Sequence, residues 1–127
     1  MDPTPKLTIR LAKDKQGNPA VVKEAEGRKH YKVVLEVDDA PSDTYAATFE
    51  LDPSYYDPLR TLKPDADGKF RLETTTYGDY PVFVRLHRAG GSDVTLKDNV
   101  VRALTRTSSN EPESLAFQVA LNDIAKN

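Results

Sequence analysis

Residues 30–37 read HYKVVLEV, and this stretch decides the fold class. Tyr31, Val33, Leu35 and Val37 recur at every second position, so they share one face of an extended chain. This spacing predicts a β-strand with one buried face and one face in water. Strands of a parallel sheet covered by helices are buried on both faces and lack such alternation. The stretch therefore predicts an antiparallel sheet.

The same alternation recurs in other segments, and turn signals separate them. The Asp67-Gly68 pair, for example, is typical of a tight turn between two strands. Strands at short, regular spacing with Gly, Pro and Asp between them predict an all-β fold, an antiparallel β-sandwich. The other predicted strands are 7–11, 44–51, 70–76 and 82–86.

The last part of the chain, from about residue 95 to residue 127, changes to helical spacing. TLKD at 95–98 has the form of a capping box, which predicts the start of a helix. The apolar residues that recur there at helical spacing are Leu96, Val100, Val101 and Leu104.

A second helix is predicted near the C-terminus. Asn110 to Glu113 repeats the cap signal, and Pro112 falls in a first helical turn, where its missing N–H is harmless. Phe117, Leu121 and Ile124 would share one helical face, although alternation of residues 117, 119 and 121 also fits a strand. With 127 residues, the chain is expected to form a single domain over 1–127, with one or two C-terminal helices.

Composition excludes several classes of function. The 18 basic and 20 acidic residues are spread along the chain and leave a net charge of −2, so no nucleic-acid surface is expected. No apolar stretch approaches the length of a membrane span. The N-terminal sequence MDPTPKLTIR lacks a basic and then apolar signal segment, which predicts a cytoplasmic protein.

Metal and enzyme motifs are missing from the sequence. It has no cysteine and only two separated histidines, so neither a metal centre nor a cofactor is expected. The motifs GxSxG, GxGxxG, HExxH and the Walker loop are absent, which predicts a protein without catalytic residues. DADG at 65–68 resembles the start of a calcium loop, but Thr76 stands where that loop needs glutamate. DADG is therefore predicted to be a turn.

Two loops, DPSYYDP at 52–58 and TTYGDY at 75–80, are rich in tyrosine. Tyrosines at the end of a sandwich can close the core and bond a nearby carbonyl. Alternatively, aromatic rings from two loops can form a cleft for a planar amide or a cation. Gly78 can bring its backbone close to such a ligand. The tyrosines are Tyr55, Tyr56, Tyr77 and Tyr80.

The two loops together resemble the YEATS domain family. Its members carry a segment like Leu-His-x-Ser-Phe, then a proline and a basic residue, then a loop like Gly-Trp-Gly-Glu-Phe. Here residues 51–55 read LDPSY and are followed by Pro58 and Arg60, and residues 76–80 read TYGDY. The similarity covers residues 30–88.

This resemblance implies an immunoglobulin-like β-sandwich that reads acylated lysine. In the family, the acyl amide slides between aromatic side chains of the two loops, and it bonds a serine hydroxyl and loop backbone. Carried over by position, Tyr55 and Tyr77 would be the aromatic walls. Ser54 would be the hydroxyl partner, Gly78 would supply backbone contact, and Tyr80 would either line or support the loop.

The chain also departs from the family pattern. Asp52 replaces the family's histidine, Pro53 stiffens the loop, and Tyr77 replaces a tryptophan. These differences fit the prokaryotic YEATS-like branch better than a histone reader. A carboxylate at Asp52 would favour a cationic ligand, such as unmodified or small-acyl lysine, or a basic partner peptide.

The leading prediction is a non-catalytic binding module for a lysine peptide, acylated or not, or a small ligand. The first alternative is a structural protein–protein interaction domain of a prokaryotic signalling or effector system. An exposed apolar patch around Phe117, Leu121 and Ile124 would favour that alternative. A second alternative, an unfamiliar enzyme, would have to use carboxylates of the two loops. Its candidates are Asp52, Asp57 and Asp79.

Overall fold

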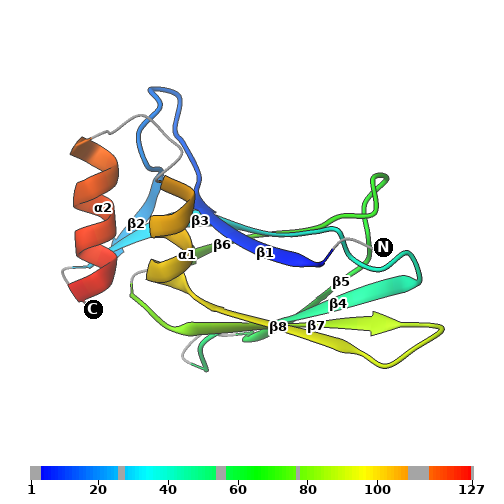
Figure 1. Cartoon of the computed structure of the whole chain (residues 1–127). Helices are drawn as coiled ribbons and strands as arrows, with labels where there is room; N and C mark the ends of the chain where they lie inside the picture. The colour runs from blue at the N-terminus through cyan, green and yellow to red at the C-terminus, as the bar shows by residue number, and fades with distance from the viewer. Residues whose placement is uncertain (1–3, 26–27, 54–56, 77, 109–114, 127) are drawn as a thin grey trace.

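The computed structural model describes residues 4–25, 28–53, 57–76, 78–108 and 115–126. Within these residues the chain forms two four-stranded β-sheets, and Figure 1 shows that they face each other as the layers of a sandwich. Two helices lie together at one end of the sandwich (Figure 1). All strand pairs are antiparallel. The predicted all-β sandwich with C-terminal helices is therefore confirmed.

The first sheet is built around one long strand. It consists of β1 (Lys6–Leu11), β2 (Val21–Ala25), β3 (Arg28–Asp38) and β6 (Phe70–Thr76). β1 and β2 both pair with one edge of β3, β2 along its first part and β1 along its second. β6 pairs with the other edge of β3.

The second sheet has the order β5-β4-β7-β8. Its strands are β4 (Thr44–Glu50), β5 (Leu59–Leu62), β7 (Pro81–Arg88) and β8 (Val94–Asn99). β8 is one edge of this sheet, as β1 is an edge of the first, and the two edges lie near each other.

The core lies between the sheets and holds the apolar side chains that alternate along the strands. Each fully buried aliphatic or aromatic side chain contributes about 1.5–3 kcal/mol to folding. The sequence pattern predicted most of these buried positions correctly, because alternate residues of a strand lie on the same side of the sheet. The largest fully buried side chains of the strands are Ile9, Val33, Leu35, Val37, Phe49, Phe70, Val82, Val84 and Leu86.

The helices are α1 (Val100–Ser108) and α2 (Leu115–Lys126). α1 continues directly from β8 and packs on β1, and α2 packs on α1. The Tyr31 hydroxyl of β3 donates a hydrogen bond of 2.7 Å to Asp123 Oδ2 of α2, which ties that helix to the first sheet. No helix among the described residues is long and apolar enough to cross a membrane.

The C-terminal part differs from its prediction at its start. Residues 95–98, expected to be a capping box, belong to strand β8, and the helical part begins at Val100 rather than near residue 95. Pairing of β8 with β7 decides this, because it buries Asp98 and half-buries Leu96 on the inner side of the sheet. Helical spacing in the α2 segment is confirmed. The second predicted cap, 110–113, lies outside the described residues.

The DADG segment forms the predicted turn. Asp65 Oδ1 accepts hydrogen bonds from the backbone N–H groups of Asp67 and Lys69, each at 2.9 Å. Gly68 has a φ of 76°, which glycine adopts without the penalty that other residues incur. The carboxylate at position 65 is therefore used to close the turn.

Candidate functional site

The two tyrosine-rich loops lie at the same end of the sandwich. β4 and β7 pair side by side, and their ladder runs as far as Glu50 opposite Phe83. The first loop therefore leaves β4 at the end of the ladder at which the second loop enters β7. The start of the first loop is thus a neighbour of the end of the second.

The first loop, 51–58, is closed by its own backbone. The N–H of Leu51 donates to the carbonyl of Pro58 at 2.8 Å, and the Leu51 side chain is buried in the core. Beyond the loop, Arg60 Nε donates to the Asp57 carbonyl at 2.6 Å and lies 3.9 Å from the Asp57 carboxylate. Asp57 is exposed, so this ion pair stabilises the fold little.

The described part of the second loop, 78–80, is held from inside the protein. The buried hydroxyl of Thr76 donates to the carbonyl of Gly78 at 2.8 Å. Gly78 is itself buried, and the Tyr80 side chain is only 8% exposed and belongs to the core. Tyr80 therefore packs beneath this loop.

The second loop is also fixed to the first turn of α1. Asp79 Oδ1 accepts a hydrogen bond of 3.0 Å from the N–H of Val101. The carbonyl of Tyr80 accepts from the N–H of Val100 at 3.1 Å. The first amides of a helix have no partner within the helix, and a side-chain carboxylate there acts as an N-cap. Asp79 performs this function although it lies more than twenty residues earlier in the chain.

Three of the six predicted site residues fall within the described part of the chain. Asp52 is half-buried beside the second loop, while Gly78 and Tyr80 are buried within it. The predicted roles of Ser54, Tyr55 and Tyr77, and of Tyr56 beside them, fall on positions outside the described residues.

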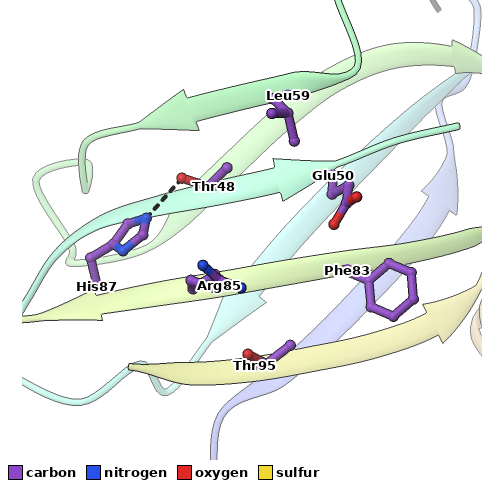
Figure 2. Close-up of a pocket in the computed structure, with 7 residues that line it drawn as sticks. All are labelled: Thr48, Glu50, Leu59, Phe83, Arg85, His87 and Thr95. Carbon is purple, nitrogen blue, oxygen red and sulfur yellow. Dashed lines mark hydrogen bonds between the residues drawn. The ribbon is translucent and has the colours of Figure 1, made fainter. Parts of the chain in front are cut away.

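A second concave surface lies on the outer face of the β5-β4-β7-β8 sheet, and none of its residues was predicted as a site. It is a groove of about 350 Å³ to which all four strands contribute side chains (Figure 2). Phe83 could have been a signal, because it is a large aromatic at an outward-facing position of a predicted strand. Lys97 Nζ lies over its ring, 5.5 Å from the centroid. The residues lining the groove are Thr48, Glu50, Leu59, Phe83, Arg85, His87 and Thr95.

His87 is the centre of a hydrogen-bonded chain across this outer face. Its Nε2 lies 2.8 Å from the Thr48 hydroxyl, as Figure 2 shows, and its Nδ1 lies 3.1 Å from Asp93 Oδ2. The hydrogen bond from His87 lowers the pKa of the Asp93 carboxyl below its ordinary value. Since that carboxylate accepts, Nδ1 carries the proton of this hydrogen bond. Thr61 lies 2.9 Å from Thr48 and extends the chain to β5.

The order hydroxyl, imidazole, carboxylate matches the arrangement of a hydrolase triad. Such a site also needs free N–H donors for the developing oxyanion. Thr48 lies on β4, whose backbone pairs with β5 on one side and β7 on the other. We therefore interpret this series of hydrogen bonds as a cross-strand network that stabilises the second sheet.

Two further observations concern metals and carboxylates. Among the described residues, no group of three or more His, Asp or Glu side chains could hold a metal ion. Asp57 and Asp79, two of the three carboxylates considered for an unfamiliar enzyme, are used in an ion pair and a helix cap.

An antiparallel sandwich with two loops at one end, one of them joined to the core, defines a small β-sandwich domain. The prokaryotic YEATS domain family matches residues 30–100. The match covers more than half of the chain, and the chain belongs to that family. It runs from β3 through β8 and includes both loops, as the resemblance had indicated. No match is found among curated proteins.

Proposed function

We propose that this domain is a non-catalytic binding module that takes a lysine-bearing peptide at the end formed by the two loops. Asp52, Ser54, Tyr55 and Tyr77 would contact the lysine side chain, and Gly78 would offer backbone contact. Tyr80 would support the second loop from the core. Family membership supports a binding module as the class of function. The hydrogen bonds that fix the second loop support the loop end of the sandwich as the position of the binding site.

The observation that carries the proposal is the anchoring of the 77–80 loop. Thr76, Tyr80 and α1 hold it at successive points. A loop that is already ordered loses little conformational entropy on binding, so more of the contact energy appears as affinity. Anchoring of this kind suits a surface that must present backbone groups to a ligand in a fixed position.

Asp52 sets the preferred charge of the ligand in this proposal. A half-buried carboxylate beside the second loop attracts a lysine ammonium, and such a partly exposed pair contributes on the order of 1 kcal/mol. Acylation removes the ammonium charge and with it this attraction. The unmodified lysine peptide is therefore expected to bind at least as well as its acetyl and crotonyl counterparts.

The alternative, a docking domain without a ligand site, would be favoured by an exposed apolar patch on the last helix. The structure buries Ile124 completely and packs Leu121 against the core. The side chain of Phe117, the third residue of that patch, lies outside the described set. Because two of the three residues face inward, the ligand-binding proposal is preferred.

Backbone amide NMR tests the proposal. The ¹⁵N-labelled domain is titrated with three peptides of identical sequence that carry unmodified, acetylated or crotonylated lysine. We expect saturable shifts at Asp52, Gly78 and their neighbours, with no equal change on the outer face around Phe83. Shifts confined to other surfaces, or no saturable shift with any of the three peptides, would rule the proposal out.

A further inference from the structure

A second groove, of about 370 Å³, lies where the edges of the two sheets approach each other. β1 and β8 form its sides, and α1, which follows β8 and packs on β1, contributes two arginines (Figure 1). It is separate from the outer groove of Figure 2 and from the loop 51–58. The residues lining it are Pro5, Lys6, Leu7, Thr8, Leu96, Lys97, Asp98, Arg102 and Arg106.

The groove is strongly basic on a chain whose net charge is −2. Lys6, Arg102 and Arg106 line it with a single carboxylate, Asp98, whereas Lys97, which also lines it, holds its ammonium over Phe83 on the outer face. That carboxylate is buried and already paired: Arg106 Nη1 lies 2.9 Å from its Oδ2, and the N–H of Asn99 donates to its Oδ1 at 2.9 Å. Asp98 therefore neutralises one cation and leaves an excess of positive charge.

An acidic residue opposite Lys6 in the ladder is also paired with another cation. Asp38 is the ladder partner of Lys6, but its carboxylate lies 3.3 Å from Lys69 Nζ. Elsewhere on the first sheet, cations have carboxylate partners across the strands, as in the pairs Arg10–Glu36 and Lys32–Glu73. The basic groove departs from that pattern.

Arg102 lies at a position where its positive charge does not stabilise its own helix. It lies in the first turn of α1, which contains no acidic residue, and the helix dipole disfavours a positive charge at that end. It is exposed, and it is four residues from Arg106, so both guanidinium groups project from the same side of the helix. An anion in the groove would offset this unfavourable charge.

Among the described residues, β8 pairs with β7 alone, so its other edge carries no strand. The Val100 N–H to Tyr80 carbonyl bond continues the β7–β8 ladder, and it shows that even-numbered residues of β8 bond to β7. Because bonding residues alternate in an antiparallel ladder, Thr95 and Lys97 direct their N–H and C=O groups away from β7. An open edge of this kind is a template for an added strand.

We propose that the basic groove binds an acidic peptide in an extended conformation, which adds to the open edge of β8. The peptide backbone would bond Thr95 and Lys97, and its carboxylates would face Lys6 and Arg102. Strand addition obtains affinity from the backbone and specificity from side chains at alternate positions. A nucleic acid would use the cations alone and leave the strand edge unpaired, so the edge favours a peptide. This site is independent of the proposed lysine site.

The test uses a peptide of about ten residues that alternates Glu and Thr, long enough at ~3.3 Å per residue to span β8. Affinity is measured by fluorescence anisotropy, and contacts are mapped by amide NMR. The variant Lys6→Glu with Arg102→Glu should weaken binding more than about tenfold, because two attractions become repulsions. The matched control is Lys15→Glu with Lys63→Glu, which makes the same change of net charge at exposed positions outside the groove. It should change affinity less than about twofold.

Two further experiments distinguish a peptide-binding site from a site that binds any anion. Thr95→Pro removes the outward N–H without breaking the β7–β8 ladder and should abolish binding, whereas Thr95→Val should retain it. A single-stranded oligonucleotide of about ten nucleotides serves as the competing probe. The proposal is overturned if the oligonucleotide binds as tightly as the peptide, if Thr95→Pro binds normally, or if the peptide does not saturate.

Discussion

The two loops at the candidate site are held in different ways. The 77–80 loop is joined to the protein by the Thr76 hydroxyl, by the cap that Asp79 forms on α1, and by the buried ring of Tyr80. In the described part of the 51–58 loop, the Leu51 N–H bonds the Pro58 carbonyl, and Arg60 bonds the carbonyl of Asp57 and pairs with its carboxylate. Residues 78–80 are thus joined to the core and to α1, whereas Leu51, Pro58 and Asp57 are joined to each other and to β5.

Both loops depart from the family pattern, the first at Asp52 and the second at Tyr77, but only the departure at Asp52 changes the charge. The substitution that changes charge, Asp52 for histidine, is on the 51–58 loop, as is Pro53. The anchored loop keeps its glycine at position 78. Connecting loops tolerate changes of side-chain chemistry better than the strands they join. We infer that the 77–80 loop fixes the shape of the site and the 51–58 loop sets the ligand preference.

The largest expected effect comes from removing the core support of the anchored loop. Tyr80→Ala deletes a buried aromatic ring and should lower the free energy of unfolding by about 3–5 kcal/mol. Urea denaturation followed by circular dichroism measures the change. The matched control is Tyr45→Ala, since Tyr45 is 59% exposed and its loss should change stability by less than about 0.5 kcal/mol. Equal effects of the two substitutions would contradict the anchoring of this loop.

An intermediate effect is expected from the helix cap. Asp79→Ala removes the acceptor for the Val101 N–H and should destabilise the domain by about 1 kcal/mol. Asp79→Asn keeps an acceptor oxygen and should retain most of that stability. Hydrogen exchange at the Val101 amide provides a local measurement: exchange should become faster in the alanine variant and change little in the asparagine variant. Unchanged protection in Asp79→Ala would show that the cap does not hold this loop.

A smaller effect on stability but a clear effect on binding is expected on the 51–58 loop. Asp52→Asn should change the free energy of unfolding by less than about 0.5 kcal/mol. It should weaken binding of the unmodified lysine peptide about fivefold, which corresponds to about 1 kcal/mol, and leave the acetyl-lysine peptide nearly unaffected. Isothermal titration calorimetry with both peptides measures the difference. If both affinities fell equally, Asp52 would not be the charge-sensing group.

The smallest expected effect is a change in the pKa of Asp93, on the outer face of the second sheet and away from both loops. The hydrogen bond from His87 holds the pKa of the Asp93 carboxyl below its ordinary value of 3.8. A carboxyl with a lowered folded-state pKa contributes stability above its unfolded pKa and loses it as pH falls through the lower folded value. His87→Leu should therefore raise the Asp93 pKa toward 3.8, as measured by carboxyl ¹³C NMR between about pH 2 and 6.

The same variant separates the outer face from the loop end. Peptide binding at the two loops should be unchanged in His87→Leu, because the hydrogen bonds of His87 run to Thr48 and Asp93 and reach neither loop. Loss of lysine-peptide affinity in this variant would place the ligand in the groove of Figure 2 instead.

Much of the sandwich could be predicted because the alternation is local. The five predicted strands correspond to β1, β3, β4, β6 and β7. β5 was missed because four residues between prolines and aspartates are too few to show a period. β8 was misread as a helix start, since Leu96, Val100, Val101 and Leu104 fit helical spacing and only pairing with β7 makes the first part a strand. β2 begins with two exposed valines, so its pattern does not alternate.

The two loops of the candidate site could be located in the sequence, but the contacts that support them could not. The two loops could be found from their tyrosines and from Gly78. The cap that joins Asp79 to Val101 is a contact between distant parts of the chain, and no local pattern at Asp79 signals it. Similarly, the basic groove forms because the edges of β1 and β8 lie near each other. The positions of Lys6 and Arg102 in the sequence do not predict this.

The most direct test of the central claim is an intermolecular NOE measurement on the complex of the domain with the unmodified lysine peptide. The account predicts contacts from the lysine methylene protons to the loop protons around Asp52 and Gly78. Contacts from those protons to Phe83 and Leu59 on the outer face, with none at the two loops, would contradict it.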